Sequence, residues 1–135
     1  MFNRGPKRDR PSMNKRRLLC VGDDVGFRNL GRSLLQNFGY DVSLAESGIR
    51  ALNLLNVWHP DVAIVDSHMV GTGGAELAWK IKRQAPHVPV ILVSDRQSIV
   101  EEAPLFLDAA SDKLAPIAQL IVQIEALVPF KVRSL

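Results

Sequence analysis

The sequence contains a single cysteine, Cys20, so the chain cannot form an internal disulfide. Cys20 lies in the apolar run LLCV, where a buried structural thiol is expected rather than a reactive one. A scaffold held together by its own disulfides is therefore excluded, and the composition is compatible with a reducing compartment.

Long hydrophobic runs are also missing. The longest apolar stretches are too short to cross a bilayer, and the charged N-terminus lacks the apolar segment of a signal peptide. We therefore expect a cytoplasmic protein without a membrane partner.

Several binding motifs are absent as well. The glycine-rich residues 71–74 lack the Lys-Ser/Thr ending of a P-loop. Trp58 and Trp79 stand without an aromatic series or a basic face, so we expect both to pack within the protein rather than stack on nucleic acid. The three histidines have no metal-ligand spacing, and we expect them on the surface or in loops. They are His59, His68 and His87.

The positive charge is confined to one end of the chain. Of 135 residues, 47% are hydrophobic and 23% charged, which suits one globular domain. Residues 1–17 hold seven Lys or Arg against Asp9, a net +6, so the total of +3 leaves −3 for residues 18–135. A disordered basic arm at 1–15, a domain at 16–129 and a short tail at 130–135 are predicted.

The role of the arm is open. The arm could bind nucleic acid or a membrane surface through its positive charge. It is equally compatible with a tail that only improves solubility, or with translation that truly starts at Met13. We do not expect nucleic acid to be the main partner.

After the arm, short solid apolar runs alternate with apolar residues at helical spacing. This alternation is typical of strands and helices taking turns along a parallel sheet, and it predicts an α/β doubly wound fold. The predicted strands are residues 18–21, 41–45, 62–65 and 90–93, with a fifth somewhere within 105–111.

The helices are predicted from the spacing of their apolar residues. Gly39 marks the end of the first helix. Its apolar positions are Phe27, Leu30, Leu34, Leu35 and Phe38. Further stripes predict a second, a third and a last helix around residues 51–55, 77–81 and 117–128. The fourth crossover is weak, because Pro104 interrupts it after barely two turns.

Polar side chains follow the predicted strands at their carboxyl ends, where open doubly wound sheets place their sites. They are Asp23, Asp24, Asp66, Ser94 and Lys113. Crowded carboxylates repel one another, and Mg²⁺ would hold them ionised. Asp66, at the end of a buried strand, would attack a phosphoryl group to give an acyl phosphate. Lys113 would neutralise the new charge and Ser94 would donate a hydrogen bond to a phosphoryl oxygen.

Structural explanations exist for some of these residues. Asp24 would equally serve as a helix N-cap, Asp23 as a turn residue and Ser94 as an ordinary loop hydroxyl. Asp66 is harder to explain in this way, because an unpaired charge at the end of a buried strand is costly.

Three segments resemble the receiver domain of two-component response regulators, and the resemblance covers residues 16–129. "CVGDD" resembles the acid pair after strand one, which implies Mg²⁺ binding by Asp23 and Asp24. "DVAIVDSHMVGTGGAEL" resembles the segment of the phosphorylated aspartate, which implies Asp66, with the backbone carbonyl of His68 as a further metal ligand. "VPVILVS" resembles the strand leading to the Thr or Ser of the family, which implies Ser94. The resemblance also implies a flavodoxin-like five-stranded sheet of order 2-1-3-4-5.

The sequence departs from this family at several positions. Val70 replaces the usual proline, and Asp95 adds a negative charge where a small residue is usual, which would slow phosphorylation. An ungapped match puts Ala115 at the lysine position, but we favour Lys113 because it keeps a cation in the loop. Strand five lacks the usual aromatic switch residue. Its position falls on Ala110 or Asp112.

The resemblance implies a stand-alone receiver rather than an enzyme. It would accept a phosphoryl group on Asp66 from a sensor histidine kinase or a histidine phosphotransfer protein and signal to a partner protein that the sequence does not identify. The alternatives are a degenerate receiver that binds proteins without efficient phosphorylation, nucleic-acid binding through the basic arm, and, least expected, a small-molecule enzyme.

Overall fold

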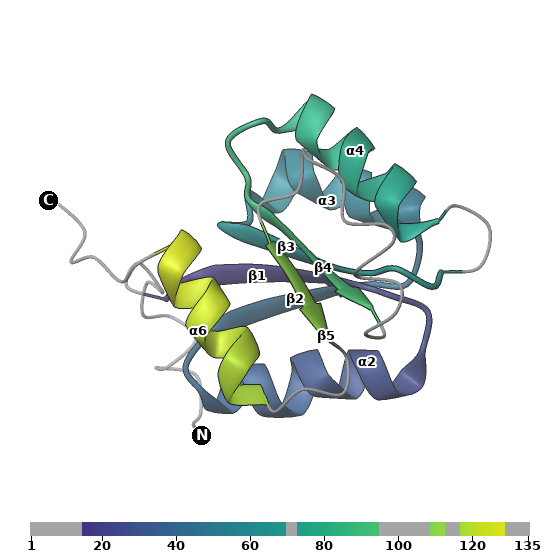
Figure 1. Ribbon diagram of the computed structural model, residues 1–135. Coiled ribbons are helices and arrows are strands. Elements are labelled where there is room, and N and C mark those ends of the chain that lie inside the picture. The colour runs from purple at the N-terminus through teal and green to yellow at the C-terminus, as the bar shows by residue number, and fades with distance from the viewer. Residues whose placement is uncertain (1–14, 70–72, 95–108, 113–116, 129–135) are drawn as a thin grey trace, which may run out of the picture.

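The computed structural model describes residues 15–69, 73–94, 109–112 and 117–128. Five parallel strands form one sheet in the order β2-β1-β3-β4-β5 (Figure 1). They are β1 Arg17–Val21, β2 Asp41–Ala45, β3 Val62–Asp66, β4 Val90–Ser94 and β5 Ala109–Asp112. The predicted parallel α/β sheet is confirmed. The predicted arm up to residue 14, the weak fourth helix and the tail fall outside the described residues.

Helices cover both faces of the sheet (Figure 1). Helices α3 and α4 pack on one face, and α2 with its continuation η1 and α6 pack on the other. They are α2 Val25–Asn29, the π-helix η1 Leu30–Leu35, α3 Gly48–Trp58, α4 Gly74–Gln84 and α6 Ile117–Leu127. None of these described helices has the length and apolar character needed to cross a bilayer.

Alternate residues of each strand pack on opposite faces, so two hydrophobic clusters sandwich the sheet. In β1, Leu19 contributes to the cluster under α3 and α4, and Leu18 and Cys20 contribute to the cluster under α2 and α6. Burial raises the pKa of the Cys20 thiol to about 12. A thiol with this pKa stays protonated at neutral pH, as expected for a structural cysteine.

The first helix departs from the prediction in its second half. Phe27 and Leu35 are buried, but Leu34 is 43% and Phe38 57% exposed. The π-helix η1 explains the difference, because its wider turn shifts later side chains around the helix axis. Gly31, four residues after Phe27, also faces the sheet, where a Cβ would lie 3.1 Å from the Cys20 Sγ. The predicted end at Gly39 is confirmed, with φ at +93°.

The two tryptophans also differ from each other. Trp58 is half-buried and packs against the cluster under α3 and α4, as predicted. Trp79 is 45% exposed on the outer side of α4, so the prediction that it packs within the protein is wrong. The buried residues of α4, including Leu77, Ala78 and Ile81, define an inner side that excludes Trp79.

Helix α6 is tied to the sheet by a small polar cluster. Arg16 Nη1 donates to Glu125 Oε1 at 2.6 Å and to the Val128 carbonyl at 3.0 Å, and the buried Tyr40 hydroxyl donates to Glu125 Oε2. The Arg16 hydrogen bond, followed by the Tyr40 one, lowers the pKa of Glu125. Burial and the bond to Glu125 raise the pKa of Tyr40 above its usual value.

Replacing Tyr40 by phenylalanine should lower the free energy of unfolding by about 1 kcal/mol at neutral pH, because a hydrogen bond to a charged acceptor is lost. The lowered Glu125 pKa contributes stability that disappears as pH falls below about 4, and the raised Tyr40 pKa contributes stability that disappears above about pH 10. Urea titrations should therefore show the largest difference from wild type between about pH 5 and 10. A difference that is constant over the whole range would contradict this account.

Candidate functional site

Asp66 is the last residue of β3 and its side chain has no exposed surface. Val65 pairs with Val21 of β1, so Asp66 lies beside Gly22, and on its other side it pairs with Val93 of β4. The carboxyl ends of the three central strands therefore meet at Asp66.

The backbone beyond Asp66 turns back to hold its carboxylate. The His68 N–H donates to Asp66 Oδ1 at 3.0 Å, and the Ser67 N–H donates to the Val93 carbonyl at 2.9 Å. The His68 side chain itself is exposed, as predicted. Its carbonyl oxygen stays a predicted metal ligand.

Two buried hydroxyls belong to Ser67, which follows Asp66 in the chain, and to Ser94, which follows the register partner of Asp66 in β4. Ser94 ends β4 with no exposed surface, and Ser67 is 8% exposed. Neither hydroxyl oxygen has a hydrogen-bond partner among the described residues. A buried polar group left without a partner costs about 1–3 kcal/mol, so both hydroxyls are candidates to bind a group that the described residues do not provide.

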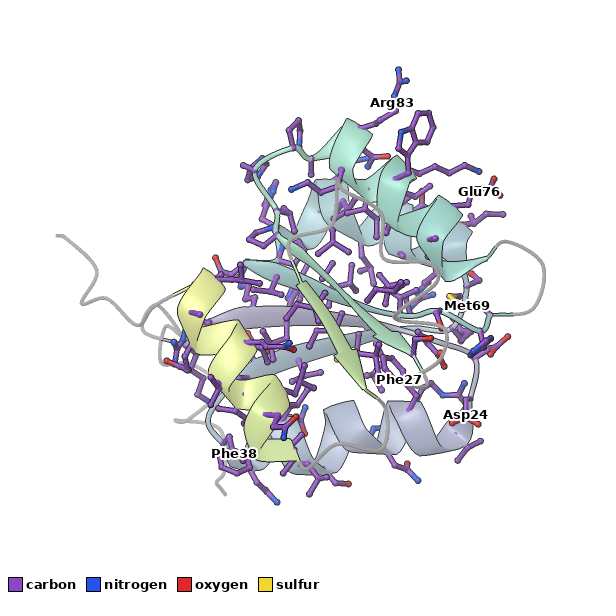
Figure 2. The ribbon with its side chains drawn as sticks, viewed as in Figure 1. Asp24, Phe27, Phe38, Met69, Glu76 and Arg83 are labelled. Carbon is purple, nitrogen blue, oxygen red and sulfur yellow. The ribbon has the colours of Figure 1, made fainter. Side chains whose placement is uncertain are left out.

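The predicted acid pair, Asp23 and Asp24, directly follows Gly22, the residue of the β1 end that lies beside Asp66. Asp23 is half-buried in the turn after β1, and Asp24 is exposed. Asp24 Oδ2 accepts the Phe27 N–H at 2.9 Å, so Asp24 does cap α2 (Figure 2). The cap fixes the start of the helix and leaves Asp24 Oδ1 outside that bond.

Oxygen atoms dominate this end of the sheet. The predicted ligands, which are the carboxylates of Asp23, Asp24 and Asp66 and the His68 carbonyl, are all oxygen atoms, and oxygen is the donor that a hard cation such as Mg²⁺ takes. Within the described residues, however, no three His, Cys, Asp or Glu side chains are grouped closely enough to hold a metal ion. The type of donor atom therefore fits the cation. The carboxylates of Asp23, Asp24 and Asp66 would have to move closer to one another to bind it together.

Several predicted residues fall outside the described part of the chain. They are Val70, Asp95, Lys113 and Ala115. The register of β5 pairs Ser94 with Asp112, so Lys113 follows the residue beside Ser94. Its predicted role stays a prediction.

Two glycines to which the sequence pattern assigns no role, Gly22 and Gly74, make this arrangement possible. A Cβ on Gly22 would lie 2.5 Å from Phe27 Cδ2 and 3.2 Å from Asp66 Cβ. A Cβ on Gly74 would lie 2.4 Å from the Asp66 carbonyl oxygen and 2.4 Å from Ser67 Cα. The Gly74 N–H also donates to the Ser67 carbonyl at 3.1 Å, so α4 begins directly on the backbone of Asp66. The available signal was the position of Gly22, directly before Asp23, and of Gly74, in the glycine-rich segment that follows Asp66.

Comparison with known sequences identifies the family of this chain. The family model of the response regulator receiver domain matches residues 18–115. Response regulator MprA of Mycobacterium sp. (strain KMS) is 32% identical over 100 residues, which cover 74% of this chain and 43% of that protein. MprA of Mycobacterium leprae is 30% identical over 115 residues, which cover 82% of this chain and 50% of that protein. The chain thus matches half or less of the length of these relatives.

Solved structures agree. The response regulator TrrA of Thermotoga maritima, in complex with Mg²⁺-BeF, superimposes with a TM-score of 0.76 at 26% identity, covering 84% of this chain and 99% of that one. NtrX of Brucella abortus gives 0.78 at 25% identity, covering 84% of this chain and 27% of that one. The sheet order, the buried aspartate at the end of β3 and these relatives lead to one conclusion: this chain belongs to the response regulator receiver domains of two-component systems.

Proposed function

We propose that this receiver accepts a phosphoryl group on Asp66 from the phosphohistidine of a sensor histidine kinase or a histidine phosphotransfer protein. The observation that carries the proposal is the buried Asp66 carboxylate at the end of β3, together with a buried Ser94 hydroxyl that no described residue binds at the end of the neighbouring strand β4. A hydroxyl in this position fits a phosphoryl oxygen as its acceptor.

In the transfer, a carboxylate oxygen of Asp66 attacks phosphorus, the P–N bond of the donor breaks, and the donor imidazole leaves with its electron pair. The His68 N–H holds Oδ1 and so orients the carboxylate for attack through the other oxygen. Because Asp66 and Ser94 are fully buried, the donor reaches them only after neighbouring segments move.

Mg²⁺ would be held by the carboxylates of Asp23, Asp24 and Asp66 and by the His68 carbonyl. When bound, it would neutralise charge on the phosphoryl oxygens. Lys113 would add a second positive charge from the loop after β5. The structure of TrrA with Mg²⁺-BeF supports this choice of ion for the family fold.

Incubation with acetyl phosphate and Mg²⁺, followed by intact-mass measurement, tests the proposal. We expect the mass of one phosphate to be added. When EDTA is present during the incubation and binds the Mg²⁺, we expect no addition. No addition with any small donor, or with a phosphorylated histidine phosphotransfer protein, would contradict the proposal. That result would favour a receiver that binds proteins without being phosphorylated. This is the main alternative, because the negative charge of Asp95 would repel an incoming phosphoryl group.

Replacing Ser94 by alanine should slow phosphorylation about tenfold, because one hydrogen bond to the charged phosphoryl group is lost. The same change removes a buried hydroxyl without a described partner, so the free energy of unfolding should stay equal or rise by about 1 kcal/mol. Initial rates by intact mass and urea unfolding measure the two effects. A destabilised variant with an unchanged rate would show that the hydroxyl is structural.

A further inference from the structure

The outer side of α4 carries an exposed aromatic residue with a cation stacked on it. Trp79 is 45% exposed, and the Arg83 Cζ lies 4.8 Å from the centre of its ring. Figure 2 shows Arg83 projecting from the far end of α4, on the side away from the sheet. Trp79 and Arg83 are four residues apart and so share one face of the helix.

The other cations of α4 are already engaged. Lys80 Nζ lies 3.4 Å from Glu76 Oε2, one turn earlier on the helix. Lys82 Nζ donates to the Pro86 and Val88 carbonyls, at 3.2 Å each. Arg83, by contrast, stacks on Trp79 and makes no hydrogen bond or ion pair to a described residue.

Stacking on the ring restricts the planar guanidinium, and no described residue accepts a hydrogen bond from its N–H groups. A guanidinium edge binds a carboxylate with two parallel hydrogen bonds, and the pre-organised plane loses little entropy on binding. The exposed ring beside it offers apolar contact area. Tryptophan and arginine are the residue types that most often dominate the energy of protein interfaces.

We propose that the Trp79–Arg83 face of α4 is a docking surface for an acidic protein segment that also carries an apolar side chain. A carboxylate of the segment would pair with the Arg83 guanidinium, and the apolar side chain would cover the exposed part of the Trp79 ring. The charge of this face favours such a segment over nucleic acid, because Glu76 neutralises Lys80 and leaves too few cations to follow a phosphate backbone. The surface does not depend on phosphorylation of Asp66.

The test uses two fluorescently labelled synthetic peptides, one of glutamate and leucine and one in which glutamine replaces every glutamate. Anisotropy titrations with the full chain, at low salt and without phosphodonor, should show the glutamate peptide binding about tenfold more tightly. Arg83→Gln and Trp79→Ala should each weaken its binding about tenfold. Both residues are exposed, so the variants should fold normally, which circular dichroism checks.

Arg32→Gln is the matched control, because Arg32 is an exposed arginine on η1, a helix that packs on the opposite face of the sheet. It removes the same charge and should leave the affinity within about twofold of wild type. Equal binding of the two peptides would overturn the proposal. So would equal losses in Arg32→Gln and Arg83→Gln, or the absence of glutamate-peptide binding at low salt.

Discussion

Replacing Asp66 by asparagine should reduce phosphate uptake at least about 10³-fold, to the background of the measurement. The amide keeps the size of the carboxylate and can still accept the His68 N–H through its carbonyl oxygen. It has no nucleophilic oxygen that could form an acyl phosphate. Intact mass after incubation with acetyl phosphate and Mg²⁺ measures the effect directly.

Asp41→Asn is the control for this experiment. Asp41 begins β2, at the amino-terminal end of the parallel strands and 4.0 Å from Arg17 Nε, whereas Asp66 ends its strand, and the change removes the same charge. It should leave phosphate uptake at the wild-type level. If Asp66→Asn gained as much phosphate as wild type, the acceptor would be a different residue and the proposed role of Asp66 would be wrong.

Replacing Gly74 by alanine should lower the free energy of unfolding by about 1–3 kcal/mol. The added Cβ would lie 2.4 Å from the Asp66 carbonyl oxygen and from Ser67 Cα, and backbone atoms cannot rotate away. Alanine is favoured over glycine in helices by up to about 1 kcal/mol, which does not offset the clash. The backbone of Asp66 would have to shift, so phosphorylation should also slow by about tenfold or more.

Gly73→Ala is the matched control at the preceding position. Gly73 has φ at −64°, and a Cβ there meets nothing within 4 Å. Its free energy of unfolding should stay within about 1 kcal/mol of wild type. Urea unfolding and initial phosphorylation rates compare the pair. Equal stability of the two variants would contradict the close approach of α4 to Asp66.

The strands were predicted closely from the sequence, because solid apolar runs between polar turns leave little choice of conformation. The third predicted strand, residues 62–65, corresponds to β3 Val62–Asp66, and the fourth, 90–93, corresponds to β4 Val90–Ser94. The first helix was predicted less well. Its apolar spacing fits an α-helix throughout, and the spacing alone contains no sign of the π-helical turns that expose Leu34 and Phe38.

Some features of the candidate site could likewise be predicted from the sequence, and others could not. The position of Asp66 at a strand end follows from the apolar run that precedes it, and parallel pairing brings Ser94 to the neighbouring strand end. Asp24 could be a cap or a ligand on sequence grounds, and only the 2.9 Å bond from the Phe27 N–H shows that it caps. The exposure of Trp79 was not predicted, because an aromatic residue in a helix can lie on the side that faces the core or on the side that faces solvent.

By itself, the sequence determined the order of strands and helices and the chemistry at the strand ends, since both depend on local periodicity and on where charges interrupt apolar runs. The tertiary structure decided which side chains come within contact distance. Gly22 and Gly74 matter because other parts of the chain pack where their side chains would be, and Arg83 stacks on Trp79 because α4 turns that face away from the core. Such contacts depend on how the elements pack in three dimensions, which local periodicity does not encode.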